Sequence, residues 1–375
     1  MSSKPTRERF LTLSSRIMKP VIGHHAGLET LRAAVQSGRL HHAWIFSGPP
    51  GIGKCLVATE FARVLLDPQA GADDLGLGGT ALASPEGEKL ANGNHPDLHV
   101  IHKEDAVHAQ TRSLRERKQM NVPLDLLRER MIGGHTSDGA KHEAPAYRKS
   151  ILGNGKVFII DEAELMDNNG QNSILKTLEE PPEDTWIILV TSRPERLLPT
   201  VRSRCDHVRF GPLSDEDMRK WLAEHPGDHE DVEWMLDWSE GAPGMALLAR
   251  ESNLIECANE LQPIIQSLDS GTWQKEFGVH VAEFVTNRSE QVVKQNKKAS
   301  KDVANKQALS LILRLLGMHV RRRLSATEPG DVETGRRLWE LANRIGDAED
   351  QLHRGLNMKH VLESLAAGWS QTCRT

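Results

Sequence analysis

The 375-residue sequence has no apolar run of about 18 residues, which is the length that a membrane-spanning helix needs. Its N-terminal ten residues are polar and contain no apolar core of a signal peptide. These absences predict a chain without a membrane span. We therefore expect the protein in the cytoplasm, with no membrane as a partner.

The sequence also has few cysteines and little net charge. The cysteines are too far apart for the paired spacing of a zinc ribbon or for a disulfide framework. They are Cys55, Cys205, Cys257 and Cys373. Lys and Arg number 47 against 52 Asp and Glu, a formal net charge of −5, so the whole chain is not a DNA-binding polycation. We expect reduced thiols, no zinc site and at most a local contact with DNA.

The most informative motif is a glycine-rich loop at residues 48–55. Its residues are Gly48, Pro49, Pro50, Gly51, Ile52, Gly53, Lys54 and Cys55. An apolar run at 43–46 precedes the loop, and helical periodicity follows it from residue 56 to residue 65. A phosphate-binding loop needs this order of strand, loop and helix, because free N–H groups at the start of the helix then point at the phosphates. The motif predicts an ATP site in which Lys54 reaches the terminal phosphates.

The last position of this loop departs from the usual pattern. Cys55 stands where a Ser or Thr hydroxyl would coordinate Mg²⁺. Mg²⁺ takes oxygen ligands in near-octahedral geometry, so a thiol sulfur is a poor substitute. The sequence therefore predicts a loop that can hold ATP without arranging Mg²⁺ for cleavage of the nucleotide.

Two further apolar runs end in polar residues that are suited to a nucleotide site. The first ends in Asp161 and Glu162 and predicts a Walker B strand, in which Asp161 holds Mg²⁺ through water and Glu162 polarises the attacking water. Two acids that serve only solubility are the alternative. The second run, 186–190, leads into Thr191 and Ser192. Their hydroxyls are expected either beside the acids, where Ser192 would contact nucleotide, or as caps of the next turn.

The order of these patterns predicts the domain organisation. Strand and helix patterns alternate over residues 1–211, apart from a glycine-rich and partly polar insertion at about 70–150. Helical periodicity alone follows, first in a lid-like segment at 212–251 and then in an all-helical domain at 252–375. The predicted fold is α/β, with a parallel P-loop sheet, a small helical lid and a helical C-terminal domain.

The predicted insertion contains four histidines whose spacing matches no compact metal site. They are His95, His99, His102 and His108. We expect them to be surface histidines, and the sequence does not indicate what the insertion does.

Three stretches outside these motifs carry a family resemblance. They read Gly-Arg-Leu-His-His-Ala at 38–43, Leu-Lys-Thr-Leu-Glu-Glu-Pro-Pro at 175–182, and Leu-Leu-Pro-Thr-Val-Arg-Ser-Arg-Cys at 197–205. Together with the loop they resemble clamp loader subunits of bacterial DNA polymerase III, a family of AAA+ proteins. The resemblance covers roughly residues 20–250. It is closest to the delta-prime subunits, with gamma/tau subunits as near relatives.

The resemblance implies an AAA+ module and a helical collar that assemble with gamma/tau and delta subunits in a five-subunit ring. In such rings ATP binding drives opening of the sliding clamp and its placement on primed template DNA. The resemblance also implies that Arg204 reaches the γ-phosphate held by a neighbouring subunit, as an arginine finger supplied in trans. An ion pair within the chain is the alternative for Arg204, and Arg202 is a further candidate.

Departures from the family pattern separate the functional hypotheses. Cys55 replaces the Mg²⁺ hydroxyl, and the zinc-ligand cysteines of relatives are absent from the insertion. Met245 follows Gly241-Ala242-Pro243-Gly244, where motor subunits carry a nucleotide-sensing arginine. These departures favour a stator, an accessory subunit that gives Arg204 to its neighbour and has weak or no ATPase activity of its own.

Two other hypotheses stay open at this point. In the first, the chain is a self-sufficient ATPase, either a gamma/tau-like motor or another AAA+ remodeller, that acts through Lys54, Asp161 and Glu162. In the second, it is a binding module that has only kept the P-loop fold.

Overall fold

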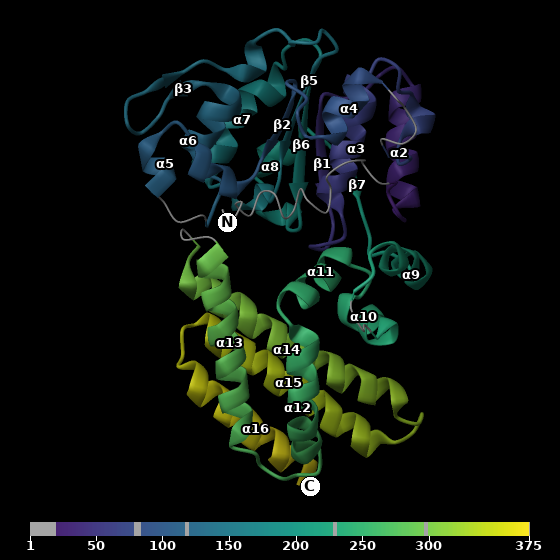
Figure 1. Cartoon of the computed structure of the whole chain (residues 1–375), viewed down its shortest axis with the longest axis vertical. Coiled ribbons are helices and arrows are strands. Elements are labelled where there is room, and N and C mark those ends of the chain that lie inside the picture. The colour runs from purple at the N-terminus through teal and green to yellow at the C-terminus, as the bar shows by residue number, and fades with distance from the viewer. Residues whose placement is uncertain (1–19, 79–83, 117–119, 228–230, 296–298, 375) are drawn as a thin grey trace, which may run out of the picture. The chain divides into compact units, whose positions relative to one another are not determined.

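A parallel sheet forms the centre of the first of two compact units into which the chain divides (Figure 1). The computed structural model describes residues 20–78, 84–116, 120–227, 231–295 and 299–374. Within them the sheet has five strands in the order β2-β5-β6-β1-β7, and all neighbouring strands run parallel. The strands are β1 (Ala43–Ser47), β2 (Leu98–Ile101), β5 (Lys156–Ile160), β6 (Thr185–Thr191) and β7 (Asp206–Arg209).

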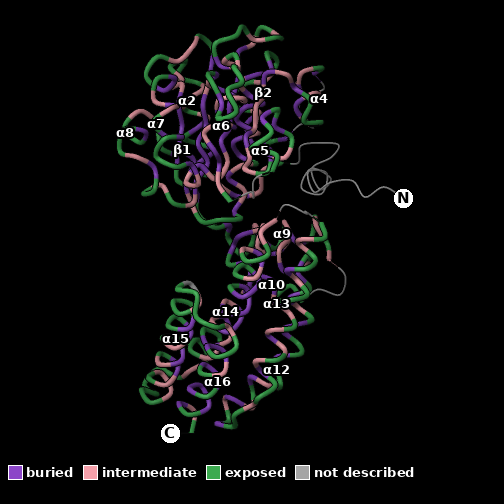
Figure 2. The backbone as a smooth tube through the Cα atoms, turned by 90° about the vertical axis from the view of Figure 1, so that its left-hand side faces the viewer, coloured by how far each residue is buried: buried purple, intermediate pink, exposed green. Residues whose placement is uncertain are grey.

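Helices cover both faces of this sheet. The helices of this unit are α2 (His25–Gln36), α3 (Lys54–Leu66), α4 (Pro85–Ala91), α5 (Arg112–Glu116), α6 (Leu124–Leu127), α7 (Asn168–Glu179), α8 (Pro199–Arg202) and α9 (Asp215–Glu224). Alternate strand residues point to opposite faces. On one face Phe61 of α3 packs edge-on against Trp44 of β1, and on the other Ile45 joins a core with Ile174 of α7. The central strands β1 and β5 are buried along their whole length, and Figure 2 shows buried positions around β1.

The segment predicted as an insertion contributes to this core. Its strand β2 forms an edge of the main sheet and pairs with β5. It also contains the short hairpin of β3 (Gly134–His135) and β4 (Lys141–His142). The expectation of surface histidines was wrong for His95, which is only 5% exposed, and His99 stacks on Phe158 at 4.6 Å between ring centroids.

The second unit is helical. It comprises Glu233–Trp238 and the described chain from Met245 onward, whereas Ser239–Gly244 belongs to the first unit. Its long helices are α12 (Leu254–Asp269), α13 (Glu276–Gln295), α14 (Lys301–Ala326), α15 (Val332–His353) and α16 (Met358–Arg374). Two shorter helices, α10 (Val232–Ser239) and α11 (Pro243–Glu251), span the change from one unit to the other. The predicted fold class, a parallel α/β sheet followed by helices alone, is confirmed.

The chain divides into two units, and the border between them runs through α10 and α11. The predicted boundaries of three separate domains stay a prediction. The predicted apolar stripes of the helical part are buried, including Leu261, Val281, Leu316 and Leu362.

None of the described helices combines the length and the apolar character that crossing a bilayer demands.

Asp269 joins three helices of the second unit and leads to a stability prediction. Its carboxylate accepts hydrogen bonds from His319 at 2.8 Å, Trp369 at 2.9 Å and Arg323 at 2.5 Å. Burial alone would raise the pKa of Asp269, but the bonds from His319 and Trp369 outweigh it and lower the pKa. We expect Asp269→Asn to lower the free energy of unfolding at pH 7 by about 1.5–3 kcal/mol, the range for hydrogen bonds to charged groups.

The pH dependence of this effect follows from the lowered pKa. The ionised carboxylate of Asp269 stabilises the fold at pH values above the pKa that Asp269 has in the unfolded chain. This stabilisation is lost as the pH falls through the lower pKa of Asp269 in the folded state. Urea denaturation followed by circular dichroism should therefore show the difference at pH 7 and at pH 5, and a shrinking difference below about pH 4. Asp347→Asn, at an exposed position of α15, is the matched control. Equal effects of the two substitutions would contradict the prediction.

Candidate functional site

The predicted phosphate-binding loop connects β1 to α3 and has the backbone that only glycines adopt readily. Gly48, Gly51 and Gly53 have φ angles of 151°, 77° and 102°. A Cβ atom on Gly48 would lie 2.2 Å from the carbonyl oxygen of Phe210, so any side chain there would displace the backbone. The strand, loop and helix therefore follow one another as predicted.

Lys54 lies inside this loop. Its Nζ donates hydrogen bonds to the carbonyl oxygens of Gly48 at 2.8 Å and Pro49 at 2.6 Å, and the residue is 7% exposed. Burial lowers the pKa of Lys54, and the carboxylates of Asp161 and Glu164 oppose that effect. A phosphate that recruits this ammonium must compete with two carbonyls of the loop itself.

Two other segments of the same unit contact the loop. The backbone N–H of Gly244 donates to the carbonyl of Gly51 at 2.8 Å, which brings the predicted lid motif against the loop. His24, which the sequence did not single out, places Nε2 2.8 Å from the carbonyl oxygen of Ile52. The loop is thus supported by residues from both ends of the unit.

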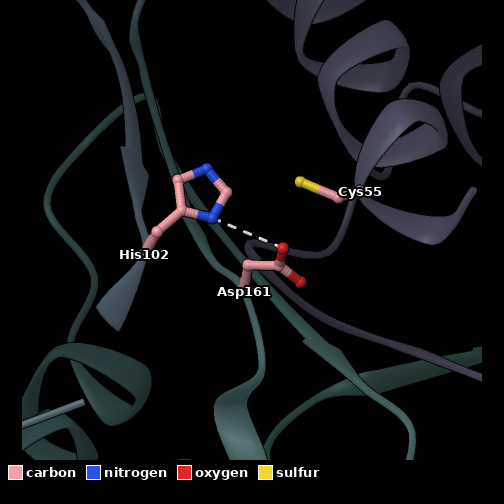
Figure 3. Close-up of side chains that lie close together, drawn as sticks. All are labelled: Cys55, His102 and Asp161. Atoms are coloured by element: carbon pink, nitrogen blue, oxygen red, sulfur yellow. Dashed lines mark ion pairs between the residues drawn. The ribbon is translucent and has the colours of Figure 1, made fainter. Parts of the chain in front are cut away.

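The two Walker B acids follow β5, and each faces a basic residue that follows β2. The parallel register pairs Ile101 with Ile160, so the next residues along each strand also lie side by side. His102 Nδ1 is 3.4 Å from Asp161 Oδ2 (Figure 3). Lys103 Nζ is 2.6 Å from Glu162 Oε2. The predicted acids are in place, but both are paired within the chain.

These pairs and the surrounding burial set the charges at the site. Burial would raise the pKa of Asp161, but the hydrogen bond and charge of His102, the N–H of Glu162 and the charge of Lys54 together outweigh it, so this pKa is lowered. Burial raises the pKa of Glu162 in spite of Lys103. Burial, together with the nearby Asp161, raises the pKa of the Cys55 thiol well above its ordinary value. At neutral pH Cys55 is therefore a protonated thiol beside an ionised Asp161.

The residues at this position do not fit Mg²⁺. Cys55, His102 and Asp161 bring a sulfur, a nitrogen and an oxygen together, with the ligand atoms all within 4.8 Å of one another. Mg²⁺ requires an octahedral set of oxygens, of which this cluster offers only the carboxylate. The backbone of the loop, in contrast, suits a phosphate, because α3 begins at Lys54 and directs its free N–H groups at the loop.

The hydroxyls of Thr191 and Ser192 lie at the end of β6. The hydroxyl and the backbone N–H of Ser192 both donate to Glu164 Oε1, at 2.5 and 3.1 Å. The Thr191 hydroxyl accepts from the N–H of Arg193 at 3.0 Å and so caps the following turn, which was one of the two expectations. Burial would raise the pKa of Glu164, but the hydrogen bonds from Ser192, Thr191 and backbone N–H groups together outweigh it and lower the pKa. Glu164 is a further acid near Lys54 that the motifs did not predict.

Arg204 follows α8 and makes the intrachain ion pair that was its alternative. Its Nη2 is 2.6 Å from Glu179 Oε1 at the end of α7, and its Nη1 donates to the carbonyl of Thr200 at 2.8 Å. The 175–182 and 197–205 stretches therefore meet at this pair. Its side chains are 34% and 48% exposed, so the pair contributes about 0–1 kcal/mol and breaks at little cost. Arg202 is exposed nearby.

The comparisons with known proteins agree on one group of replication proteins. The family model described as DNA polymerase III, delta subunit, matches residues 23–214, just over half of the chain. The delta' subunit of DNA polymerase III from Escherichia coli is 30% identical over 248 residues, which cover 65% of this chain and 65% of that protein. The delta' subunit from Bacillus subtilis is 29% identical over 235 residues, covering 62% and 57% of the two chains.

A gamma/tau subunit is similar over a shorter part. The DNA polymerase III subunit gamma/tau of Mycobacterium bovis is 32% identical over 208 residues, which cover 54% of this chain and 30% of that protein. The chain spans less than two thirds of the length of these curated relatives. The region that the family model matches contains the loop, both Walker acids and Arg204.

Proposed function

Since this chain belongs to the DNA polymerase III, delta subunit family, we propose that it is a delta-prime-type subunit of a clamp loader. It acts in the cytoplasm with gamma/tau and delta subunits and helps place the sliding clamp on primed template DNA. Within that complex it is a stator: it gives Arg204 to the ATP site of a neighbouring subunit and hydrolyses little or no ATP itself.

The observation that carries this proposal is the pairing of both Walker B acids within the chain. Glu162 would have to leave Lys103, 2.6 Å away, before it could polarise a water molecule. Asp161 faces His102 and the thiol of Cys55 where the Mg²⁺ shell would be held. These contacts support a pocket that is poorly equipped for hydrolysis even if ATP enters the loop.

The position of Arg204 supports the other half of the proposal. A guanidinium is permanently charged and offers several donors in a fixed plane, which suits the γ-phosphate of a neighbouring subunit. Its partly exposed pair with Glu179 is weak enough to be exchanged for a phosphate. In the isolated chain the ion pair with Glu179 holds Arg204, and Arg204 exchanges this partner for the γ-phosphate when a neighbouring subunit binds.

One observation favours the second candidate, a self-sufficient ATPase. The loop glycines and Lys54 are intact and correctly folded, so the chain has the parts that bind phosphates. Nucleotide binding alone does not supply the metal or the attacking water, and for that reason we place this candidate second.

The isolated chain tests the choice between the two candidates. We expect no ATP hydrolysis above background, and no increase in Cys55→Thr, because that change leaves Glu162 paired with Lys103. The measurement is phosphate release by the chain alone, with the assembled gamma/tau and delta complex as the positive control for the assay. Robust hydrolysis that Lys54→Ala abolishes would overturn the stator role and favour the motor. A chain that neither joins the complex nor supports clamp loading would overturn the clamp loader assignment itself.

A further inference from the structure

Three side chains from distant parts of the sequence converge beside the phosphate-binding loop (Figure 3). Cys55 lies in the first turn of α3, His102 follows β2, and Asp161 follows β5. Their ligand atoms all lie within 4.8 Å of one another, and His102 Nδ1 is already 3.4 Å from Asp161 Oδ2.

We propose that Cys55, His102 and Asp161 form a three-ligand site for Zn²⁺, with a fourth position open to water. The site goes beyond the clamp loader function and does not depend on it. It also departs from the expectation of no zinc site, which considered only closely spaced cysteines. The tertiary structure brings one cysteine to two other ligands instead.

The distances fit a zinc ion after a small movement of one side chain. Zinc binds nitrogen and oxygen at about 2.0–2.2 Å and sulfur at about 2.3 Å, so neighbouring ligand atoms of a tetrahedron are roughly 3.3–3.7 Å apart. The 3.4 Å separation of the His102 and Asp161 atoms already has this value. The sulfur of Cys55, within 4.8 Å of both, must approach by no more than about 1.5 Å.

Two of the three ligands are held in position by neighbouring groups, as metal ligands usually are. The pairing of Ile101 with Ile160 fixes His102 beside Asp161. The backbone N–H of His102 donates to Asp105 at 2.9 Å. Asp161 accepts the N–H of Glu162 on Oδ1 at 2.9 Å, which leaves Oδ2 directed at His102.

The chemistry of the donors selects zinc over Mg²⁺. A thiolate and an imidazole suit a borderline-soft ion, whereas Mg²⁺ takes oxygen ligands. Binding of Zn²⁺ would displace the proton of the Cys55 thiol to solvent, and the negative charges of the resulting thiolate and of the Asp161 carboxylate would together balance the divalent cation. The Lys54 ammonium is engaged by the carbonyls of Gly48 and Pro49. A bound zinc ion would tie α3 to β2 and β5 at the place where a motor subunit holds its Mg²⁺.

Cobalt provides a direct probe of the site. The full-length chain is freed of metal with a chelator, reduced, and titrated with Co²⁺ and then with Zn²⁺. We expect one equivalent of Co²⁺ with a thiolate-to-cobalt charge-transfer band in the near ultraviolet, and its loss on addition of Zn²⁺. Cys55→Ser should abolish the band, and His102→Ala or Asp161→Asn should weaken Zn²⁺ binding at least roughly tenfold. Cys205→Ser and His99→Ala are matched controls that should leave binding unchanged.

A second measurement uses the wild-type chain and so does not depend on the folding of a variant. Zn²⁺ should slow the alkylation of Cys55 by iodoacetamide, as mapped by mass spectrometry, but not that of Cys373. The proposal is overturned if Zn²⁺ does not protect Cys55, or if the cobalt band survives Cys55→Ser. Either result would leave the proposed role of Arg204 untouched, because that role is tested in the assembled complex.

Discussion

Arg204→Ala is expected to lower ATP hydrolysis about a thousandfold at the neighbouring site of an assembled complex with gamma/tau and delta subunits. The guanidinium is proposed to stabilise charge on the oxygens of the transferred phosphoryl group, and alanine offers no donor there. The effect is measured as single-turnover hydrolysis in complexes whose other ATP sites carry a substitution of the loop lysine. Arg204→Lys should not restore the rate, because an ammonium lacks the planar set of donors.

Two variants of the same chain serve as controls for this result. Arg202→Ala removes an exposed arginine two residues away and should leave hydrolysis unchanged. Glu179→Gln breaks the ion pair that holds Arg204 in the isolated chain, so hydrolysis should be unchanged or faster. Gel filtration must show that every variant still assembles. If intact complexes with Arg204→Ala hydrolyse ATP at the wild-type rate, the arginine finger is wrong.

The second large effect concerns stability. Glu60 and Arg63 of α3 form an ion pair that is almost fully buried, at 1% and 0% exposure of their side chains. Arg63 donates to both carboxylate oxygens, at 3.0 and 2.8 Å, and the N–H groups of Gly76 and Gly78 donate to the same carboxylate. Glu60→Ala would leave the buried Arg63 charge uncompensated. We expect a loss of about 3–5 kcal/mol in the free energy of unfolding.

The neighbouring helix provides a matched control. Glu29 and Arg32 of α2 form a pair with the same spacing, but Glu29 is 70% exposed. Glu29→Ala should therefore change the free energy of unfolding by less than about 1 kcal/mol. Urea denaturation of both variants and the wild type, followed by circular dichroism, gives the comparison. Similar losses in the two variants would mean that burial does not decide the strength of these pairs.

Local sequence patterns determined much of the fold and part of the site. The apolar runs at 43–46, 156–160 and 186–190 became β1, β5 and β6, because a buried parallel strand is a short contiguous apolar segment. The glycine loop and α3 are likewise encoded in adjacent residues, since glycine backbone freedom and helical periodicity act over a few positions. The helical character of the chain after Pro212 follows from the same periodicity.

Only the tertiary structure decided which side chains meet at the site. His102 and Lys103 face Asp161 and Glu162 because β2 pairs with β5 in one register, and a strand pairing between distant segments leaves no local pattern in either of them. Arg204 meets Glu179 for the same kind of reason, through the packing of α7 and α8. The sequence by itself thus named the loop with its thiol and the two acids, whereas the basic partners of those acids were set by contacts between segments far apart in the chain.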